Sequence, residues 1–271
     1  MAKGKKRKLV NAQPAKARNA QSATKPAKAP PAKKLEPTIP FNAEDRILLV
    51  GEGDFSFAKS IIEHLGCCDV IATCLDGQEE LFEKYEPQGE AHVRYLEVEG
   101  QTVLYNVDAT KLDEHKKLKS GQLFDRIIFN FPHVGGKSKD VNRQVRFNQE
   151  LLVKFLGAAL PLLAQDGTIT ITLFEGEPYT LWNIRDLARH SGLEVQRSFR
   201  FQAEAYPGYS HSRTLGNIEG GGGWRGEDRD ARSYIFQKKA RNPTVLPVKA
   251  PTTAGKKRKK STQGDDSDEE G

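Results

Sequence analysis

Apolar residues gather into short runs between residues 46 and 238, and their spacing predicts alternating strands and helices. Residues 47–50 form an unbroken apolar run that ends at a glycine, which is typical of a strand covered on both faces. Apolar residues then recur at 57, 58, 61, 62 and 65, the spacing of one helix face, which Gly66 would end. The same patterns predict further strands at 70–75, 103–107, 124–131, 168–174, 193–201 and 233–237, and further helices at 78–85, 141–160 and 181–190.

The order of these elements predicts the fold. Strands and helices alternate with short connections, which indicates an α/β, doubly wound, mostly parallel sheet with right-handed crossovers. We count seven strands in the pattern. The last two are separated by residues 202–232, a stretch rich in glycine and aromatic residues. A loop of that length inside a compact domain is usually functional or disordered.

Charge is distributed unevenly along the 271 residues, whose net charge is +6. Residues 1–40 hold eleven Lys and Arg and one acid, and residues 239–271 hold eight Lys and Arg and five acids. The 198 residues between them hold 23 basic and 30 acidic side chains, a net charge of −7. The excess positive charge therefore lies in the two ends, around an acidic middle long enough to bury a core.

We predict that residues 1–42 and 239–271 are disordered tails around a folded domain at 43–238. The first tail is mostly Lys, Ala and Pro, which cannot bury enough apolar area to offset the entropy of ordering. Basic runs at 5–8 and 256–260 are typical of nuclear-import signals or phosphate-binding arms. The alternative is a solvated tail that aids solubility.

Several other classes of protein and site are excluded. No stretch approaches the roughly 18 uncharged apolar residues of a membrane span, and the basic N-terminus lacks the apolar core of a secretory signal. Cys67, Cys68 and Cys74 lack CxxC spacing, which argues against a disulfide framework or a zinc site and indicates reduced core thiols. We expect no membrane partner and no metal, and we expect a monomer.

Glycines and acids follow the first three predicted strands, where open α/β sheets bind ligands. Glycines let the backbone approach a ligand closely. Asp76 lies 25 residues past Gly51, near the spacing of an acid that accepts hydrogen bonds from ribose hydroxyls. The predicted cofactor-binding residues are Gly51, Glu52, Gly53, Asp54, Phe55, Ser56, Asp76 and Asp108.

The glycine motif favours S-adenosylmethionine over a dinucleotide. The G-x-G-x-x-G fingerprint has Ser56 at its third position here, and the acids at 52 and 54 sit badly against a pyrophosphate at a helix N-terminus. Residues 41–110 hold fifteen acids and four bases, which suits a cationic ligand. S-adenosylmethionine has ribose, adenine and a sulfonium, and no phosphate. The alternative is a solvated acidic surface with structural glycines.

A second motif, Asn130-Phe131-Pro132-His133, follows the fourth predicted strand. It resembles the Asn/Asp-Pro-Pro-Tyr/Phe turn of nucleobase amino-methyltransferases. In that turn, the polar side chain and a backbone carbonyl hold the target nitrogen in line with the methyl group. The alternative is a strand-ending turn with a surface histidine.

Three segments together resemble one family: residues 47–57 (ILLVGEGDFSF), 130–136 (NFPHVGG) and 206–211 (YPGYSH). They are similar to the eukaryotic large-subunit ribosomal RNA uridine-N3 methyltransferases, in the fungal-type form with a single domain. The resemblance covers about residues 43–238 and implies a Rossmann-like domain that uses S-adenosylmethionine. It also implies N3-methylation of a uridine in large-subunit (25S-like) rRNA during ribosome biogenesis, in the nucleus and nucleolus.

Uracil N3 is a weak nucleophile until its proton leaves, so the site must position the base and accept or relay that proton. We expect Asn130 and the backbone at Phe131 and Pro132 to orient the uracil edge, with Phe131 or His133 stacked on it. His133 is the leading general base because its unperturbed pKa lies near neutrality. Glu175, from the neighbouring strand end, is the alternative.

RNA contacts are expected in the second half of the domain, since residues 111–238 hold nineteen basic and fifteen acidic side chains. Basic residues suit phosphates, and aromatic residues suit stacking on unpaired bases. The alternatives are a solvated helix start and a loop that packs on its own domain. The candidate RNA-binding residues are Lys137, Lys139, Arg143, Arg146, Tyr206, Tyr209, His211 and Arg213.

Three other functions stay open at this point. The chain could be a non-catalytic ribosome-assembly factor that keeps the fold and binds large-subunit rRNA or a pre-ribosome. It could be a nucleotide-dependent oxidoreductase, which Ser56 and the acidic first loop disfavour. It could also be a methyltransferase that acts on another RNA or another base.

Overall fold

The computed structural model describes Met1 and residues 37–214, 216–217 and 226–239. The chain divides into Met1–Glu36 and Pro37–Gly271, and all described residues except Met1 belong to the second unit. Most of the two predicted tails, with both basic runs, therefore lies outside the described residues. Phe41 is buried in the core, so the packed chain begins slightly before the predicted boundary at 43.

The described residues form a seven-stranded sheet in the order β3-β2-β1-β4-β5-β7-β6. Neighbouring strands run parallel except β7, which pairs antiparallel with both β5 and β6. The prediction of a doubly wound, mostly parallel, seven-stranded sheet is confirmed. The strands are β1 Arg46–Leu49, β2 Asp69–Thr73, β3 Thr102–Leu104, β4 Phe124–Asn130, β5 Leu163–Phe174, β6 Leu193–Arg200 and β7 Ala231–Lys238.

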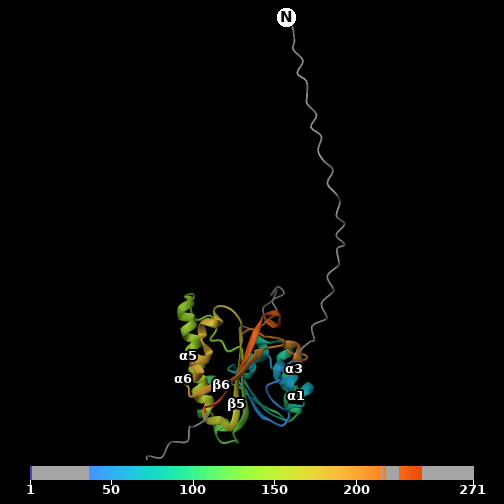
Figure 1. The fold of residues 1–271 in the computed structure, drawn as a ribbon. Helices are drawn as coiled ribbons and strands as arrows, with labels where there is room; N and C mark the ends of the chain where they lie inside the picture. Colours follow the sequence, from blue (N-terminus) through green and yellow to red (C-terminus); the bar gives the residue numbers. More distant parts are fainter. Residues whose placement is uncertain (2–36, 215, 218–225, 240–271) are drawn as a thin grey trace, which may run out of the picture. The chain divides into compact units, whose positions relative to one another are not determined.

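Helices cover both faces of the sheet, and Figure 1 shows α1 and α3 on one side and α5 and α6 on the other. Alternate residues of β1 divide between the two cores, since Leu48 packs with α5 and Ile47 and Leu49 pack with α1. This explains the unbroken apolar run of that strand. The helices are α1 Ser56–Leu65, α2 Gln78–Lys84, α3 Gln88–Val98, α4 Lys116–Lys119, α5 Val141–Ala159 and α6 Ile184–His190, and the 3₁₀ turns are η1 Ala109–Glu114, η2 Leu160–Leu162, η3 Tyr179–Trp182, η4 Ala203–Ala205 and η5 Gly226–Asp228.

Several element boundaries differ from the prediction. The helix α3 was not predicted, because Val93 and Leu96 are the main buried side chains in an otherwise polar segment. The strand β3 ends before 107, since Asn106 takes a positive φ of 56° that a strand does not allow. The helix predicted from 181 begins at Ile184, after Asn183 in the left-handed conformation.

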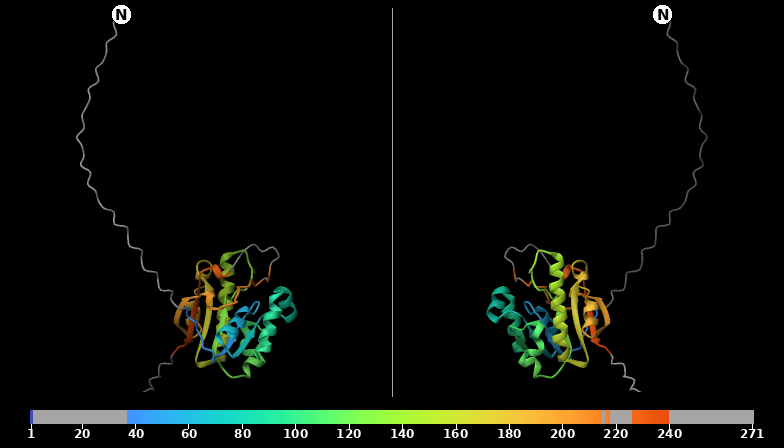
Figure 2. Two further views of the ribbon diagram at one scale, coloured as in Figure 1. Left: turned by 90° about the vertical axis from the view of Figure 1, so that its right-hand side faces the viewer. Right: turned by 90° about the vertical axis from the view of Figure 1, so that its left-hand side faces the viewer.

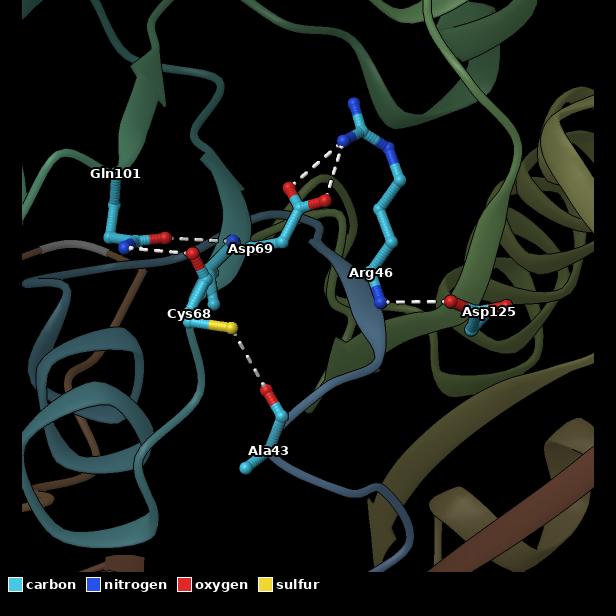
Figure 3. A network of polar contacts seen from close by, with 7 residues as sticks. Ala43, Arg46, Cys68, Asp69, Gln101 and Asp125 are labelled. Carbon is cyan, nitrogen blue, oxygen red and sulfur yellow. Dashed lines mark hydrogen bonds and ion pairs between the residues drawn. The ribbon is translucent and has the colours of Figure 1, made fainter.

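A polar network ties together the amino ends of the strands (Figure 3). Arg46 at the start of β1 donates to both carboxylate oxygens of Asp69 at 2.7 and 2.9 Å, and its backbone N–H donates to Asp125 at 2.9 Å. The side chain of Gln101, just before β3, accepts a hydrogen bond from Val70 N–H at 2.8 Å. These contacts hold the amino ends of the strands in place, on the side of the sheet opposite the carboxyl ends where ligands bind.

The remaining predictions on cysteines and membranes are settled in part. All three cysteines are free thiols, but Cys68 is exposed, so only Cys67 and Cys74 are core residues. Cys68 lies on the loop before β2, where its thiol donates to the carbonyl of Ala43. Within the described residues, no helix is long and apolar enough to cross a membrane.

Candidate active site

A pocket of about 810 Å³ opens at the carboxyl ends of the central strands. It brings together the glycine turn after β1, the acids after β2 and β3, the Asn-Phe-Pro-His turn after β4 and part of the long loop before β7. The predicted site residues that line it are Gly51, Glu52, Gly53, Asp54, Ser56, Asp76, Asp108, Asn130, Phe131, Pro132, His133, Lys137, Tyr209, His211 and Arg213.

The glycine turn needs its glycines for space and for backbone conformation. Gly51 has φ +67°, and a Cβ there would lie 2.5 Å from Cε2 of Phe129. A Cβ on Gly53 would lie 3.2 Å from Cβ of Ser212 and 3.4 Å from the Tyr85 hydroxyl. The backbone is thus held close to the pocket, as a cofactor-binding turn requires. Phe55 is fully buried beneath the turn and belongs to the core rather than the lining.

The two acids of this turn occupy the N-terminus of α1. The backbone N–H of Ala58 donates to Glu52 at 3.3 Å, and the N–H of Ser56 donates to Asp54 at 3.0 Å. Burial raises the pKa of Glu52 to about 8, with a smaller contribution from the charge of Asp54, against the lowering effect of the Ala58 hydrogen bond. A pyrophosphate would have to displace these two carboxyl groups from the helix end that normally binds it, which argues against dinucleotide chemistry.

The acids after β2 and β3 are each held by a neighbour. Lys84 donates to Asp76 at 2.8 Å, and both side chains are largely shielded. Asp108 accepts from the backbone N–H and the hydroxyl of Thr110 at 2.8 and 2.7 Å. Burial would raise the pKa of Asp108, but these bonds and the charges of Lys111 and Lys154 outweigh it, so the pKa is lowered. Asp108 is therefore a fixed carboxylate with lone pairs on the pocket side available to a polar ligand.

The turn after β4 carries strain and an unsatisfied donor. Phe131 has φ 50°, which is costly for a bulky side chain. Its N–H donates to Thr172 on β5 at 2.8 Å, which holds that conformation. Among the described residues, Nδ2 of Asn130 is buried without a hydrogen-bond partner. A buried amide in a pocket that lacks a protein partner is suited to a polar ligand.

His133 lies at the outer end of this turn. The backbone N–H of Gly135 donates to its Nδ1 at 2.9 Å. Burial lowers the pKa of the ring, although part of its surface remains exposed. Gln144 on α5 fixes the following residues, since it donates to the Gly135 carbonyl at 2.5 Å and accepts from Ser138 N–H at 3.1 Å.

Part of the long loop crosses the pocket, and we call residues 206–214 with 216 and 217 the crossing segment. Ser56 donates to the carbonyl of Ser210 at 3.0 Å and accepts from its N–H at 3.2 Å. Further along, the Tyr85 hydroxyl donates to the Arg213 carbonyl at 3.0 Å, and Asn217 N–H donates to the Lys84 carbonyl at 2.9 Å. In the left view of Figure 2, the orange trace of this segment runs toward the teal helices α2 and α3.

His211 connects the crossing segment to the turn after β4. Its ring packs edge-on against Phe131 at 4.5 Å and Phe174 at 5.2 Å between centroids. The backbone N–H of His211 donates to the carboxylate of Glu227 at 2.5 Å, and the ring Nδ1 is 3.1 Å from the Tyr209 hydroxyl. Burial lowers the pKa of His211 to about 4, against the opposing charges of Glu227 and Asp54. The imidazole is therefore neutral at physiological pH.

Other predicted site residues lie elsewhere. Glu175 is outside the lining and forms an ion pair with Arg232 at 2.5 Å. Tyr206 is buried, with its ring stacked on Phe201 at 5.5 Å between centroids, so it presents no face to RNA. Lys139, Arg143 and Arg146 are exposed around the start of α5, beyond the lining.

Several residues of the pocket were not predicted from the sequence. Arg229 lies over the ring of Phe174 at 4.1 Å, and Tyr179 lies beside that ring at 5.4 Å between centroids. Tyr85 and Lys154 also belong to the lining. Arg229 follows residues 218–225 and shortly precedes β7, a position that has neither a motif nor an apolar pattern. Arg229 reaches the pocket because β7, which starts two residues later, pairs antiparallel with β5 and so brings it beside Phe174 at the end of that strand.

Charges in the lining divide between the two halves of the chain. The acids Glu52, Asp54, Asp76 and Asp108 come from the ends of β1, β2 and β3, whereas Glu150 pairs with Lys154 on α5. The basic residues of the lining are Lys137, Lys154, Arg213 and Arg229. The acids suit a cationic ligand and the basic side chains suit an anionic one. The two sets lie close together in places, since the charge of Lys154 lowers the pKa of Asp108.

Comparisons with known proteins identify the family of this chain. The family model described as BMT5-like, rRNA (uridine-N3-)-methyltransferase BTM5-like, matches residues 48–213. A Saccharomyces cerevisiae protein, 25S rRNA (uridine(2634)-N(3))-methyltransferase, is 33% identical over 75% of this chain and 76% of its own length.

Two further proteins extend the comparison. A Mus musculus protein, ferredoxin-fold anticodon-binding domain-containing protein 1 homolog, is 33% identical over 70% of this chain, which spans 30% of that relative. A methyltransferase structure from Pyrococcus furiosus aligns with a TM-score of 0.44 and 21% identity, over 73% of this chain and 77% of that one. On the family model and the yeast relative, this chain belongs to the BMT5-like family of rRNA (uridine-N3)-methyltransferases.

Proposed function

We propose that this protein transfers a methyl group from S-adenosylmethionine to N3 of a uridine in large-subunit rRNA. The observation that carries the proposal is the pocket itself. A single lining joins the glycine turn and the acids after β1, β2 and β3 to the Asn-Phe-Pro-His turn and four basic side chains. The yeast relative that spans most of this chain is named for this reaction on 25S rRNA.

The glycine turn and the acids after β2 and β3 fit S-adenosylmethionine. Asp76 and Asp108 offer carboxylates to ribose hydroxyls or to the adenine edge, and the Gly51–Gly53 backbone leaves room beside them. Glu52 offers a carboxyl group that a cation would ionise, because its pKa of about 8 lies above physiological pH. When bound, the cofactor supplies an electrophilic methyl group on a sulfonium. A positively charged cofactor suits the acids of the lining better than the negatively charged pyrophosphate of a dinucleotide does.

The turn after β4 and the aromatic side chains beside it fit an unstacked pyrimidine. The unpartnered amide of Asn130 can hydrogen-bond to the base edge, and the Phe131 and Phe174 rings form an apolar wall 4.5 Å apart between centroids. A uridine within folded rRNA would have to leave its stack to reach this depth. The chain's contribution to rate then comes mainly from holding N3 in line with the methyl group.

The geometry refines the roles proposed for a general base. His133 accepts a hydrogen bond at Nδ1, so its neutral ring carries the proton on Nε2 and has no free lone pair for the N3 proton. Glu175 lies outside the lining. His211 is neutral and borders Phe131, but a pKa of about 4 makes it a weak base. This favours proton loss to solvent or to a water relay, with positioning as the main source of acceleration.

RNA would approach over the basic side chains of the pocket lining and the start of α5. Lys137, Arg213 and Arg229 line the pocket, and Lys139, Arg143 and Arg146 lie exposed nearby. Such side chains suit phosphates on either side of the target nucleotide. Tyr209 remains a candidate for stacking, whereas Tyr206 serves the core.

We extend the proposal to the rest of the chain. The basic runs at 5–8 and 256–260, which lie outside the described residues, add sequence-independent RNA affinity and direct the protein to the nucleus and nucleolus. The protein acts there as a monomer on large-subunit rRNA or a pre-ribosome, during ribosome biogenesis. A truncated chain of residues 41–238 should keep cofactor affinity and lose much of its RNA affinity.

The decisive experiment is nucleoside mass spectrometry of large-subunit rRNA from cells with and without the gene. We expect 3-methyluridine to decrease in the deletion and to return with the wild-type chain but not with Asn130→Ala. Unchanged 3-methyluridine would overturn the proposal. If methylation is lost while purified Asn130→Ala still binds both cofactor and RNA, the alternative of a non-catalytic assembly factor is excluded.

A further inference from the structure

His133 presents one kind of hydrogen-bonding group to the pocket. The Gly135 N–H donates to Nδ1 at 2.9 Å, so that nitrogen must keep its lone pair. The neutral ring then carries its hydrogen on Nε2. A hydrogen on Nδ1 instead would set two donors against each other, Nδ1–H and the Gly135 N–H. Gln144 helps to hold this turn, since it donates to the Gly135 carbonyl at 2.5 Å. His133 is thus a fixed donor at the pocket wall.

A fixed donor distinguishes the two pyrimidines at the atom next to N3. Uracil has a carbonyl oxygen at C4, which accepts a hydrogen bond, whereas cytosine has an amino group there, which donates. Both bases have the same oxygen at C2, so a contact on that side carries no such information. We propose that Nε2–H of His133 donates to O4 of the target base and thereby selects uridine over cytidine for methylation at N3. This inference rests on the proposed function.

The neighbouring groups support this assignment. Asn130 lies three residues earlier in the same turn, and its unpartnered Nδ2 provides a second contact to the base edge. An asparagine amide has both a donor and an acceptor, so it does not by itself exclude cytosine. The Trp182 ring lies 6.0 Å from His133 between centroids and limits where the imidazole can move. A cytosine amino group facing Nε2–H would leave two donors unpaired, which sites built for a hydrogen bond reject strongly.

The test uses two transcripts of the rRNA segment that the wild-type protein methylates, with uridine or cytidine at the target position. The full-length chain is assayed as wild type, His133→Gln and His133→Ala, with His190→Gln as the matched control. His190 is exposed at the end of α6, outside the pocket lining. Products are separated as 3-methyluridine and 3-methylcytidine, and kcat/KM is measured for each transcript. Cofactor binding by calorimetry shows whether each variant retains an intact pocket.

Glutamine can present either its N–H₂ or its carbonyl oxygen, so His133→Gln should accept both bases. We expect its uridine-to-cytidine ratio of kcat/KM to fall about 10- to 100-fold, with cofactor affinity unchanged. His133→Ala should lose activity on uridine without gaining any on cytidine, and His190→Gln should match the wild type.

An unchanged ratio in His133→Gln, or full activity on uridine in His133→Ala, would overturn the inference while leaving the proposed function intact. A wild-type protein that methylates neither transcript, nor native large-subunit rRNA, would overturn the proposed function and this inference together.

Discussion

Glu52 makes cofactor affinity depend on pH in a direction that the structure fixes. Burial raises the pKa of this carboxyl to about 8, and Asp54 adds to the shift. Below that pH the free pocket therefore holds a neutral Glu52. A bound cation favours the carboxylate, so binding releases a proton and affinity rises as the pH increases toward 8. Above that value, the carboxyl is already ionised and the dependence ends.

The size of the effect follows from the fraction of Glu52 that is ionised before binding. With a pKa of about 8 in the free protein, and a much lower one in the complex, affinity should rise about 50-fold between pH 6 and pH 8. Glu52→Gln mimics the neutral form at every pH. It should bind the cofactor more weakly than the wild type at every pH, and the ratio of the two affinities should widen about 50-fold between pH 6 and pH 8.

The assay compares S-adenosylmethionine with S-adenosylhomocysteine by calorimetry from pH 6 to pH 9. The two ligands share the same amino and carboxyl groups and differ in the charge on sulfur, so their affinity ratio cancels ligand titration. The ratio should rise with pH in the wild type and stay flat in Glu52→Gln. A constant ratio in the wild type, with no proton released on binding, would refute the reasoning.

Three further substitutions test the fold and the pocket. Gly51→Ala should abolish cofactor binding and lower the free energy of unfolding by more than about 1 kcal/mol, because the new Cβ would lie 2.5 Å from Cε2 of Phe129. In the control Gly157→Ala, the new Cβ meets no atom within 4 Å, so the melting temperature should rise slightly. Ser56→Ala removes both hydrogen bonds to Ser210, so amide exchange in the crossing segment should speed up about tenfold, and unchanged exchange would contradict that role. Phe155→Ala, fully buried, should cost about 3–5 kcal/mol in urea unfolding.

The strand pattern could be predicted because burial on both faces leaves an unbroken apolar signal. Residues 47–50 and 70–75 carry that signal, and the parallel sheet then determines where their carboxyl ends meet. For the same reason, Gly51, Asp76 and Asn130 could be assigned to one pocket from the sequence alone. The helix α3 could not be predicted from the sequence, because few of its side chains are apolar and buried.

The remaining part of the site could not be predicted, because it depends on contacts between distant segments. Ser56 looked like a missing third glycine, but its hydroxyl holds Ser210, which is 154 residues away. Tyr206 and Tyr209 looked equivalent in an aromatic loop, yet one fills the core and the other faces the pocket. Residue type gives no sign of which aromatic side chain turns inward. The contacts of Tyr206 with Phe57, which is distant in the sequence, and with Phe201 place that ring in the core.

Two adjacent residues of the crossing segment contact different parts of the pocket, the start of α1 and the turn after β4. Ser210 is bonded to the start of α1, and His211 packs on Phe131. If one ligand shifts the segment, the contacts available to the other ligand therefore change as well. Coupling free energies are reciprocal. If the methyl donor raises the affinity for RNA by some factor, RNA raises the affinity for the donor by the same factor. By the same reciprocity, departure of either product would weaken the binding of the other by one shared factor.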